Sequence, residues 1–298
     1  MICNINKYGL KTKFIKDSIY QPNIPYCIDN LLTIMDNENN VLFFIDKNRN
    51  FITKNNYLAG KYLSIIGDSI STYSGYSPSG YAEYYPKGDL NSVNKTWWMQ
   101  VCKATGLKLL KNASWSGSSV ADKDDSPENS AEIAYSDARI NDLADGDITP
   151  DIIIILIGTN DYNRGYPIGN LSITDDIPDG SVSIHDIKPA YACMLNKVIN
   201  TYPYAHIYCC TLISRYKGSD KIYPILSNGI SLAQINNAIM EVSNWLGANI
   251  IRLDNLFPLQ VLDTFMYDGT LHPNAEGAKI IAQRITKTIM EGERQWLL

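Results

Sequence analysis

The stretch DIIIILI, residues 151–157, constrains the fold more than any other part of this chain. After Asp151 every side chain is isoleucine or leucine, with no polar residue in alternation, as is typical of a strand covered on both faces. Such strands belong to parallel sheets, whose crossover connections place helices on both sides. The run is also far too short to span a bilayer. It therefore predicts an α/β fold around a parallel sheet.

The pattern from residue 61 onward supports this prediction, because short apolar runs alternate with amphipathic segments of helical length. Strands that alternate with helices give a doubly wound sheet, in which functional residues gather at the carboxyl ends of the strands. The predicted strands are 62–66, 107–110, 151–157, 206–212 and 249–253, and the predicted helices are 97–105, 131–143, 190–202, 232–246 and 275–291.

Residues 1–58 have a different pattern of apolar and polar residues. The apolar runs LLTIM, VLFFI and FIT are separated by clusters of Asp and Asn, which predicts a small β-meander of two or three strands. So small a sheet is marginal alone and needs something to pack on. We predict two domains: residues 1–58, with an attachment or packing role, and residues 59–298, which carry the chemistry.

Composition narrows the classes of function. The 298 residues are 45% hydrophobic and 19% charged, with a formal net charge of -5, which gives no basic footprint for nucleic acid or an anionic membrane. The N-terminus, MICNINKYGLKTKF, lacks the apolar core of a signal peptide. We predict a cytoplasmic protein without a membrane span. A component of a larger particle such as a phage tail, assembled through the N-terminal segment, is the alternative.

Cysteine and histidine usage argues against metal or disulfide chemistry. The six cysteines form no C-x-x-C pair and read as reduced thiols, and three histidines without an H-E-x-x-H motif leave little material for a metal site. The acidic loop with Asp122, Asp124, Asp125 and Glu128 fits a solvated loop better than a Ca²⁺ site. No cofactor and no metal are predicted.

Polar residues follow three of the predicted strands and precede the last helix. They occur in the blocks Gly67-Asp68-Ser69, NASWSG at 112–117, GTND at 158–161 and DGTLHPN at 268–274. A serine, a histidine, a carboxylate, an amide and a glycine at one edge of a sheet are the groups that acyl transfer requires. The four blocks therefore predict a catalytic site.

Each residue has a defined task in that chemistry. Ser69 is a weak nucleophile that needs a base, and His272 can take its proton and return it to the leaving group. The backbone N–H groups of Ser69 and Gly117 and the amide of Asn160 are candidate donors to the oxyanion. Taken singly, each position also fits an ordinary turn, helix cap or core residue, so the weight lies in the combination.

These four blocks, in this order, resemble the SGNH or GDSL-type hydrolase family over residues 62–298. The resemblance implies a flavodoxin-like three-layer α/β/α sandwich and serine-esterase chemistry. By the same resemblance Ser69 is the nucleophile, His272 is the base, and Ser69, Gly117 and Asn160 form the oxyanion hole.

The last block departs from the family pattern. The family usually has D-x-x-H, whereas here Gly269 occupies that place and Asp268 lies four residues before His272. We predict that a one-residue bulge brings Asp268 to the imidazole. Asp254, Asp263 and a Ser–His dyad without a carboxylate are the alternatives.

The loop STYSGYSPSGYAEYYPKGD, residues 71–89, bears on the substrate because five tyrosines crowd it. Flat rings with polar tips suit sugars, whereas a long acyl chain needs an apolar tunnel. We predict an acetylesterase acting on a small ester or an acetylated glycan, with Tyr73, Tyr76 and Asp161 as substrate-binding residues. Tyrosines that merely pack the loop, a lipase or thioesterase for longer acyl chains, and a non-catalytic glycan-binding or particle-surface module are the alternatives.

Overall fold

The computed structural model describes residues 58–122, 130–217 and 225–295, together with the backbone of five strands before residue 58. It divides into two compact units, residues 1–60 with 103–106, and residues 61–102 with 107–298. The boundary at residue 58 and the role of the N-terminal segment stay predictions.

The N-terminal unit contains a sheet of five strands, two or three of which were expected. Each strand pairs with the next in antiparallel orientation, so the sheet is a meander. The two strands that were not predicted, ICNI and LKTK, lack a continuous apolar run and therefore gave little sequence signal. The strands are β1 (Ile2–Ile5), β2 (Leu10–Lys13), β3 (Asn30–Met35), β4 (Val41–Asp46) and β5 (Phe51–Thr53).

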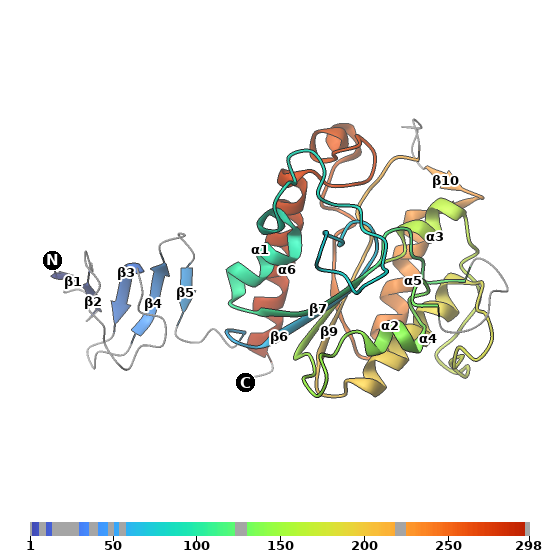
Figure 1. Ribbon diagram of the computed structural model, residues 1–298, viewed down its shortest axis with the longest axis horizontal. Helices are drawn as coiled ribbons and strands as arrows, with labels where there is room; N and C mark the ends of the chain where they lie inside the picture. Colours follow the sequence, from blue (N-terminus) through green and yellow to red (C-terminus); the bar gives the residue numbers. More distant parts are fainter. Residues whose placement is uncertain are drawn as a thin grey trace. The chain divides into compact units, whose positions relative to one another are not determined.

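The second unit is built on a five-stranded parallel sheet with the order β12-β9-β8-β6-β7 (Figure 1). Counted along the chain from β6, this is the flavodoxin-like order 2-1-3-4-5. Its central strand β8 consists of five fully or almost fully buried residues, as the DIIIILI run predicts. The strands are β6 (Tyr62–Gly67), β7 (Lys108–Ser114), β8 (Ile152–Leu156), β9 (His206–Cys210) and β12 (Asn249–Ile251).

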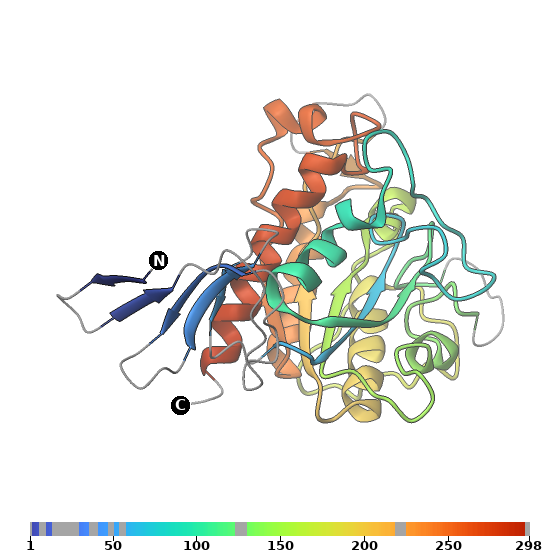
Figure 2. The same cartoon turned by 60° about the vertical axis from the view of Figure 1, so that its left-hand side comes forward.

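Helices cover both faces of this sheet and complete the predicted three-layer sandwich (Figures 1 and 2). α1 (Trp97–Thr105) and α6 (Ala275–Gln295) lie on one face. α6 buries Ile281, Ile285 and Ile289, one turn apart, as an amphipathic helix does. No helix within the described ranges is long and apolar enough to cross a membrane. The other face carries α2 (Asp137–Asn141), α4 (Ile187–Thr201) and α5 (Leu232–Trp245).

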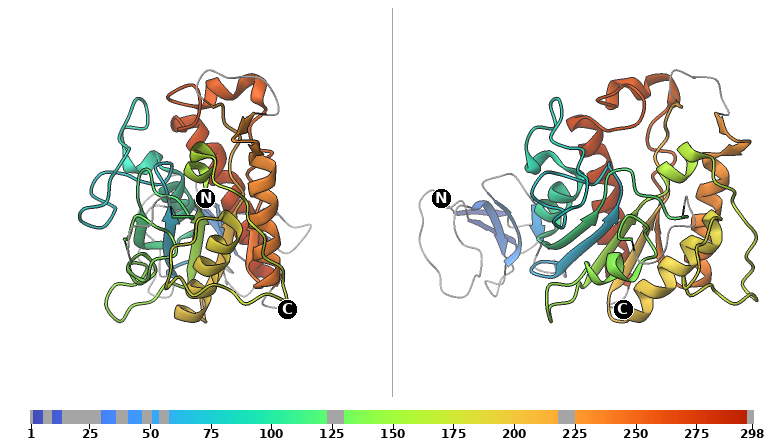
Figure 3. Two further views of the ribbon diagram at one scale, coloured as in Figure 1. Left: turned by 90° about the vertical axis from the view of Figure 1, so that its right-hand side faces the viewer. Right: turned by 45° about the vertical axis from the view of Figure 1, so that its right-hand side comes forward.

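Several element bounds differ from the predicted ones. β7 continues to Ser114 through the polar residues NAS, which the apolar run at 107–110 did not indicate. α2 covers only Asp137–Asn141 of the predicted helix 131–143, because the Ser136 hydroxyl accepts the backbone N–H of Arg139 and caps the helix there. The remaining short elements are η1 (Val93–Lys95), α3 (Thr159–Arg164), the hairpin of β10 (Leu226–Ser227) and β11 (Ile230–Ser231), and η2 (Leu259–Phe265). Figure 3 shows the parallel sheet between its helices from two further directions.

The strand order determines where a site forms. The chain passes from β6 outward to β7 and then crosses back to β8 on the other side of β6, so the direction of winding reverses between β6 and β8. In open α/β sheets, ligands bind in the crevice outside the carboxyl ends of the strands at such a reversal. Ser69 follows β6 and Asn160 follows β8, so both lie at this crevice.

The burial of β8 gives a test of the core. Ile154→Ala should lower the free energy of unfolding by about 3 kcal/mol, because it removes buried methyl groups from a strand that packs on both faces. Ile148→Ala, at a side chain with 44% exposure, should cost less than about 0.5 kcal/mol. Urea denaturation followed by tryptophan fluorescence measures both, and it reports on the second unit because all five tryptophans lie beyond residue 60. Equal losses would contradict the assignment of β8 as the core strand.

Candidate active site

A tight turn presents Ser69 at the end of β6. The Asp68 carboxylate accepts the backbone N–H of Ile70 at 3.0 Å, and the Asp68 carbonyl accepts the N–H of Ser71 at 3.0 Å. Gly67 is required here because a Cβ would lie 2.6 Å from the Ser71 hydroxyl oxygen. The turn therefore depends on the glycine and aspartate that precede the serine.

Ser69, His272 and Asp268 form a continuous hydrogen-bonded chain. The Ser69 Oγ lies 2.9 Å from His272 Nε2, and His272 Nδ1 lies 2.5 Å from Asp268 Oδ2. Since a serine needs a base at one imidazole nitrogen and the base needs an acceptor at the other, the three side chains have the relative positions that nucleophilic catalysis requires.

The extra residue before His272 is accommodated by a turn at Gly269, whose φ of +70° favours glycine. The other Asp268 oxygen, Oδ1, accepts the backbone N–H groups of Thr270, Leu271 and His272 at 2.8–3.1 Å. Partial burial opposes ionisation of Asp268, but the hydrogen bonds from the His272 side chain and these N–H groups hold its pKa well below the usual range. The carboxylate is thus ionised and fixed in orientation.

The alternative carboxylate Asp254 is engaged elsewhere. It accepts hydrogen bonds from Arg252 at 2.6 and 2.7 Å and from the Thr211 hydroxyl at 2.8 Å. The side chain of Asp268 contacts the imidazole.

The loop that carries Gly117 is fastened to two strand ends. The Gly67 carbonyl accepts the N–H of Trp115 at 3.1 Å, and the Asn160 amide donates to the Ser118 carbonyl at 2.8 Å. That bond uses one amide hydrogen of Asn160 and leaves the second available. Within the described ranges, the backbone N–H groups of Ser69 and Gly117 have no protein acceptor. Three donors are therefore present around the turn that bears Ser69.

A buried arginine lies behind this loop. The Arg139 side chain is fully buried and donates from Nη2 to the Gly67 carbonyl at 2.6 Å, from Nη1 to the Ala131 carbonyl at 2.6 Å, and from Nε to the Ala113 carbonyl. Burial lowers the pKa of Arg139 to about 10, so the guanidinium keeps its charge at neutral pH. It joins the carboxyl ends of β6 and β7.

Sequence reasoning did not identify Asp68 as more than a turn residue, but it is a buried carboxyl next to the serine. Burial raises the pKa of Asp68 to about 6, although the Ile70 N–H, the His272 side chain and the guanidinium groups of Arg215 and Arg139 oppose the rise. The local sequence does not distinguish an aspartate directly after a strand, such as Asp68, from an ordinary turn aspartate. Only the three-dimensional fold brings the two arginines near it.

Asp161 was predicted to bind substrate, and the structure corrects this. Its side chain is fully buried, and the carboxylate accepts the N–H of Val120 at 3.0 Å and that of Ala121 at 2.8 Å. Asp161 therefore holds the end of the Gly117 loop and has no surface for a ligand. Arg164, one turn further along α3, donates to the Gly117 carbonyl at 2.8 Å.

The tyrosine that packs on His272 is Tyr84, which is not one of the two predicted as substrate-binding residues. Its ring stacks on the His272 imidazole with 3.7 Å between centroids and 12° between planes. Tyr73 is buried, and Tyr76 packs against Tyr73 and Trp98 with centroids 6.1 and 5.4 Å apart. In the described part of the chain neither has a ring contact or hydrogen bond to Ser69 or His272. The sequence shows that five tyrosines lie in this loop, but it does not indicate which of their rings packs on His272.

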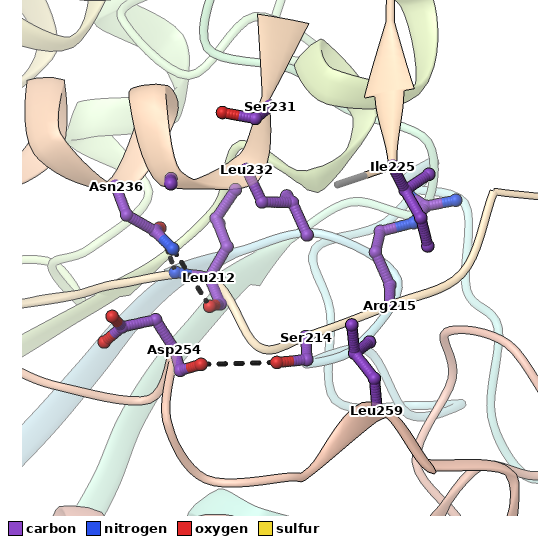
Figure 4. A pocket seen from close by; sticks show the side chains of 10 residues that line it. Leu212, Ser214, Arg215, Ile225, Ser231, Leu232, Asn236, Asp254 and Leu259 are labelled. Carbon is purple, nitrogen blue, oxygen red and sulfur yellow. Dashed lines mark hydrogen bonds between the residues drawn. The ribbon is translucent and has the colours of Figure 1, made fainter. Parts of the chain in front are cut away.

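A cavity of about 200 Å³ lies at the same edge of the sheet, beyond the carboxyl end of β9 (Figure 4). Its lining combines aliphatic side chains with Ser214, Arg215, Ser231, Asn236 and Asp254. The Arg215 guanidinium donates to the carbonyl and hydroxyl oxygens of Thr159 at 3.1 and 3.0 Å. Since Thr159 precedes Asn160, one wall of the cavity supports the turn that carries a candidate oxyanion donor.

Metal ligands were not expected, and residues 58–122, 130–217 and 225–292 contain no group of three or more His, Cys, Asp or Glu side chains arranged to hold an ion. Of the acidic loop, Asp124, Asp125 and Glu128 lie outside the described residues. Asp122 accepts a hydrogen bond from the Ser183 hydroxyl at 2.7 Å.

The chain is similar to known proteins in sequence and in fold. The family model for GDSL-like lipases and acylhydrolases matches residues 61–214, just over half of the chain. Two similar structures are candidate GDSL-like lipases from Bacteroides uniformis (26% identity, TM-score 0.59, 80% of this chain and 100% of that one) and Bacteroides ovatus (25%, 0.56, 78% and 98%). A family two carbohydrate esterase from Clostridium thermocellum, solved with cellohexaose, shares the fold (18%, 0.51, 80% and 66%). No curated protein matches the sequence.

The chain belongs to the GDSL-like lipase/acylhydrolase family. This membership makes it an ester hydrolase, and the predicted resemblance is confirmed.

The buried carboxyl of Asp161 gives a prediction about stability and pH. Burial raises its pKa from 3.8 to about 7, against the N–H donors of Val120 and Ala121. Between these values the folded protein holds a proton that the unfolded chain has lost, so the free energy of unfolding falls as the pH rises. Asp161 contributes up to about 4 kcal/mol to that fall.

Asp161→Asn should therefore make the stability decline less steeply between pH 4 and 7 in urea denaturation. Asp68 contributes a fall of the same sign up to pH about 6 in both proteins. Asp147→Asn, at an exposed position, is the matched control and should keep the wild-type slope. If the curves of wild type and Asp161→Asn are parallel, Asp161 does not titrate in this range.

Proposed function

We propose that this protein is a serine esterase that removes small acyl groups, acetyl above all, from a carbohydrate. Ser69 is the nucleophile, His272 the general base and acid, and Asp268 the carboxylate that orients the imidazole. The observation that carries the proposal is the chain of hydrogen bonds from Asp268 through His272 to Ser69, at 2.5 and 2.9 Å.

Acylation begins when the Ser69 oxygen attacks the ester carbonyl carbon and its proton passes to His272 Nε2. Asp268 stabilises the resulting imidazolium through Nδ1–H. The negative charge that develops on the carbonyl oxygen is met by the N–H groups of Ser69 and Gly117 and by the free amide hydrogen of Asn160. The bond to the alcohol oxygen then breaks, and Nε2 returns the proton to that oxygen.

Deacylation reverses these roles with water. Nε2 takes a proton from the water, whose oxygen attacks the acyl carbon, and the same three donors stabilise the second oxyanion. The bond to Ser69 Oγ breaks, the proton returns to Oγ, and the carboxylic acid leaves. Ser69 is thus regenerated without any cofactor.

The surroundings of the serine support a sugar as the alcohol part of the ester. Trp115, two residues before Gly117, packs on Tyr81 with 4.4 Å between centroids, so two aromatic rings lie together at the Gly117 loop. Aromatic side chains with polar groups nearby commonly pack against the rings of bound carbohydrates. The nearby cavity adds hydroxyl, amide, carboxylate and guanidinium groups, which suit a ligand rich in hydroxyls better than a long alkyl chain.

Two other functions remain as alternatives. A lipase or thioesterase would use the same three catalytic side chains but prefer long acyl chains. A non-catalytic glycan-binding or particle-surface module would use the crevice without turnover. The Asp268–His272–Ser69 hydrogen bonds favour catalysis over the second of these, because a binding module has no need of an aligned base.

The first test compares short and long esters. Wild type should hydrolyse p-nitrophenyl acetate more efficiently than p-nitrophenyl octanoate, and Ser69→Ala should lower kcat at least about 10⁴-fold with an unchanged circular dichroism spectrum. Ser74→Ala, an exposed serine five residues further on, serves as the control and should keep wild-type activity. A preference for octanoate would favour the lipase, whereas equal rates for wild type and Ser69→Ala would exclude Ser69 as the nucleophile.

A second test addresses the displaced carboxylate. Asp268→Asn should lower kcat by about 10⁴-fold, because an amide in this place favours the wrong imidazole tautomer and does not stabilise the imidazolium. Asp263→Asn, which changes an alternative residue, should leave kcat near the wild-type value. Steady-state kinetics on p-nitrophenyl acetate measures both. Wild-type kcat in Asp268→Asn would point to a Ser–His dyad.

A further inference from the structure

The ring of Tyr84 lies parallel to the His272 imidazole, with 3.7 Å between their centroids. We propose that Tyr84 is a positioning residue that holds the plane of the imidazole so that Nε2 faces the Ser69 oxygen. This inference rests on the proposed function, since it assigns Tyr84 a role only if His272 acts as the base of Ser69. It concerns a residue that none of the four motif blocks contains.

The need for such a contact follows from how His272 is held. Its two hydrogen bonds, to Asp268 and to Ser69, both lie at the ring edge and roughly along one axis through the imidazole. Bonds along one axis fix the distance between the partners, but they restrain tilting of the ring about that axis only weakly. A second ring packed face to face blocks that tilt. Tyr84 supplies this restraint.

The backbone of Tyr84 is tied to the nucleophile. Its N–H donates to the Thr72 hydroxyl oxygen at 2.8 Å, and that hydroxyl donates to the Ser69 carbonyl at 3.1 Å. These two hydrogen bonds therefore fix the position of Tyr84 relative to the turn that carries the attacking oxygen.

The next residue is tied to the base. Tyr85 is buried, and its hydroxyl donates to the carbonyl of Pro273, the residue after His272, at 2.6 Å. The rings of Tyr84 and Tyr85 meet edge to face with 5.0 Å between centroids. The dipeptide thus joins the serine turn to the histidine loop, two segments about 200 residues apart in the chain.

The ring face also has an electrostatic effect in the reaction. When Ser69 transfers its proton to Nε2, the imidazole becomes a cation against the electron-rich face of Tyr84, which stabilises a positive charge. Lys87 Nζ lies 4.7 Å from the centroid of the same ring and interacts with it as a second cation. The restraint of the imidazole plane and the stabilisation of its positive charge both come from the Tyr84 ring and not from its hydroxyl. Phenylalanine at this position should therefore keep both effects.

The test uses Tyr84→Leu, which removes the flat ring, and Tyr84→Phe, which keeps it. With p-nitrophenyl acetate, Tyr84→Leu should lower kcat about 10-fold with little change in KM, because a misaligned base slows proton transfer but does not weaken substrate binding. Tyr84→Phe should retain kcat within about twofold. Tyr204→Leu makes the same change at a tyrosine with 95% exposure between α4 and β9 and should behave as wild type.

A second readout is independent of the substrate. A fluorophosphonate probe reacts covalently with a serine whose base is in place, so its rate of labelling reports on the Ser69–His272 pair alone. Labelling of Tyr84→Leu should slow by the same factor as kcat, while that of Tyr84→Phe should not. If Tyr84→Leu melts well below wild type, Tyr84→Met, a second flexible side chain without a ring, replaces it in the same comparison.

The outcomes separate this inference from the proposed function. A wild-type protein that neither hydrolyses acetate nor reacts with the probe overturns both. A reactive wild type together with an equally reactive Tyr84→Leu overturns only the role of Tyr84. A raised KM with unchanged kcat and labelling would make Tyr84 a substrate contact, which also overturns the positioning role.

Discussion

The buried guanidinium of Arg139 is the constraint on which the rest of the site depends. Carbonyl groups at the carboxyl ends of parallel strands lack partners in the sheet, and a buried one without a hydrogen bond is costly. Arg139 satisfies the carbonyls of Gly67 and Ala113 together, and so binds the last residue of β6 to β7. Because the same Gly67 carbonyl also accepts the N–H of Trp115, the turn that carries Ser69 and the Gly117 loop are held by one group.

A second set of contacts comes from α3. Three side chains of this short helix bind the Gly117 loop: Asn160 binds Ser118, Asp161 binds Val120 and Ala121, and Arg164 binds Gly117 itself. These contacts hold α3, which follows the central strand β8, beside the point where the strand order reverses. The donors proposed for the oxyanion are therefore held by backbone and side-chain hydrogen bonds rather than by the substrate, which is what preorganised stabilisation requires.

Individual residues show how far sequence reasoning reached. The DIIIILI run predicted the central strand, and the order of the four blocks predicted the family, which is confirmed. Asp161 was predicted to bind substrate, yet its carboxylate accepts the N–H groups of Val120 and Ala121. Tyr84 was one of five tyrosines in a loop, and the sequence offers no signal that distinguishes it. Contacts between groups 40 or more residues apart in the chain leave no pattern in the local sequence.

The sequence by itself determined the elements and the chemistry available to them. The period of the apolar residues and the local composition identify strands, helices and helix caps, because each of these elements depends on residues that are close together in the chain. The tertiary structure alone decided which groups meet: that the turn at Gly269 brings Asp268 to His272, that Tyr84 covers the imidazole, and that Asp161 is buried. The physical reason is that these contacts arise from packing and strand order, which join segments far apart in the chain and set each side chain's direction only once the sheet has formed.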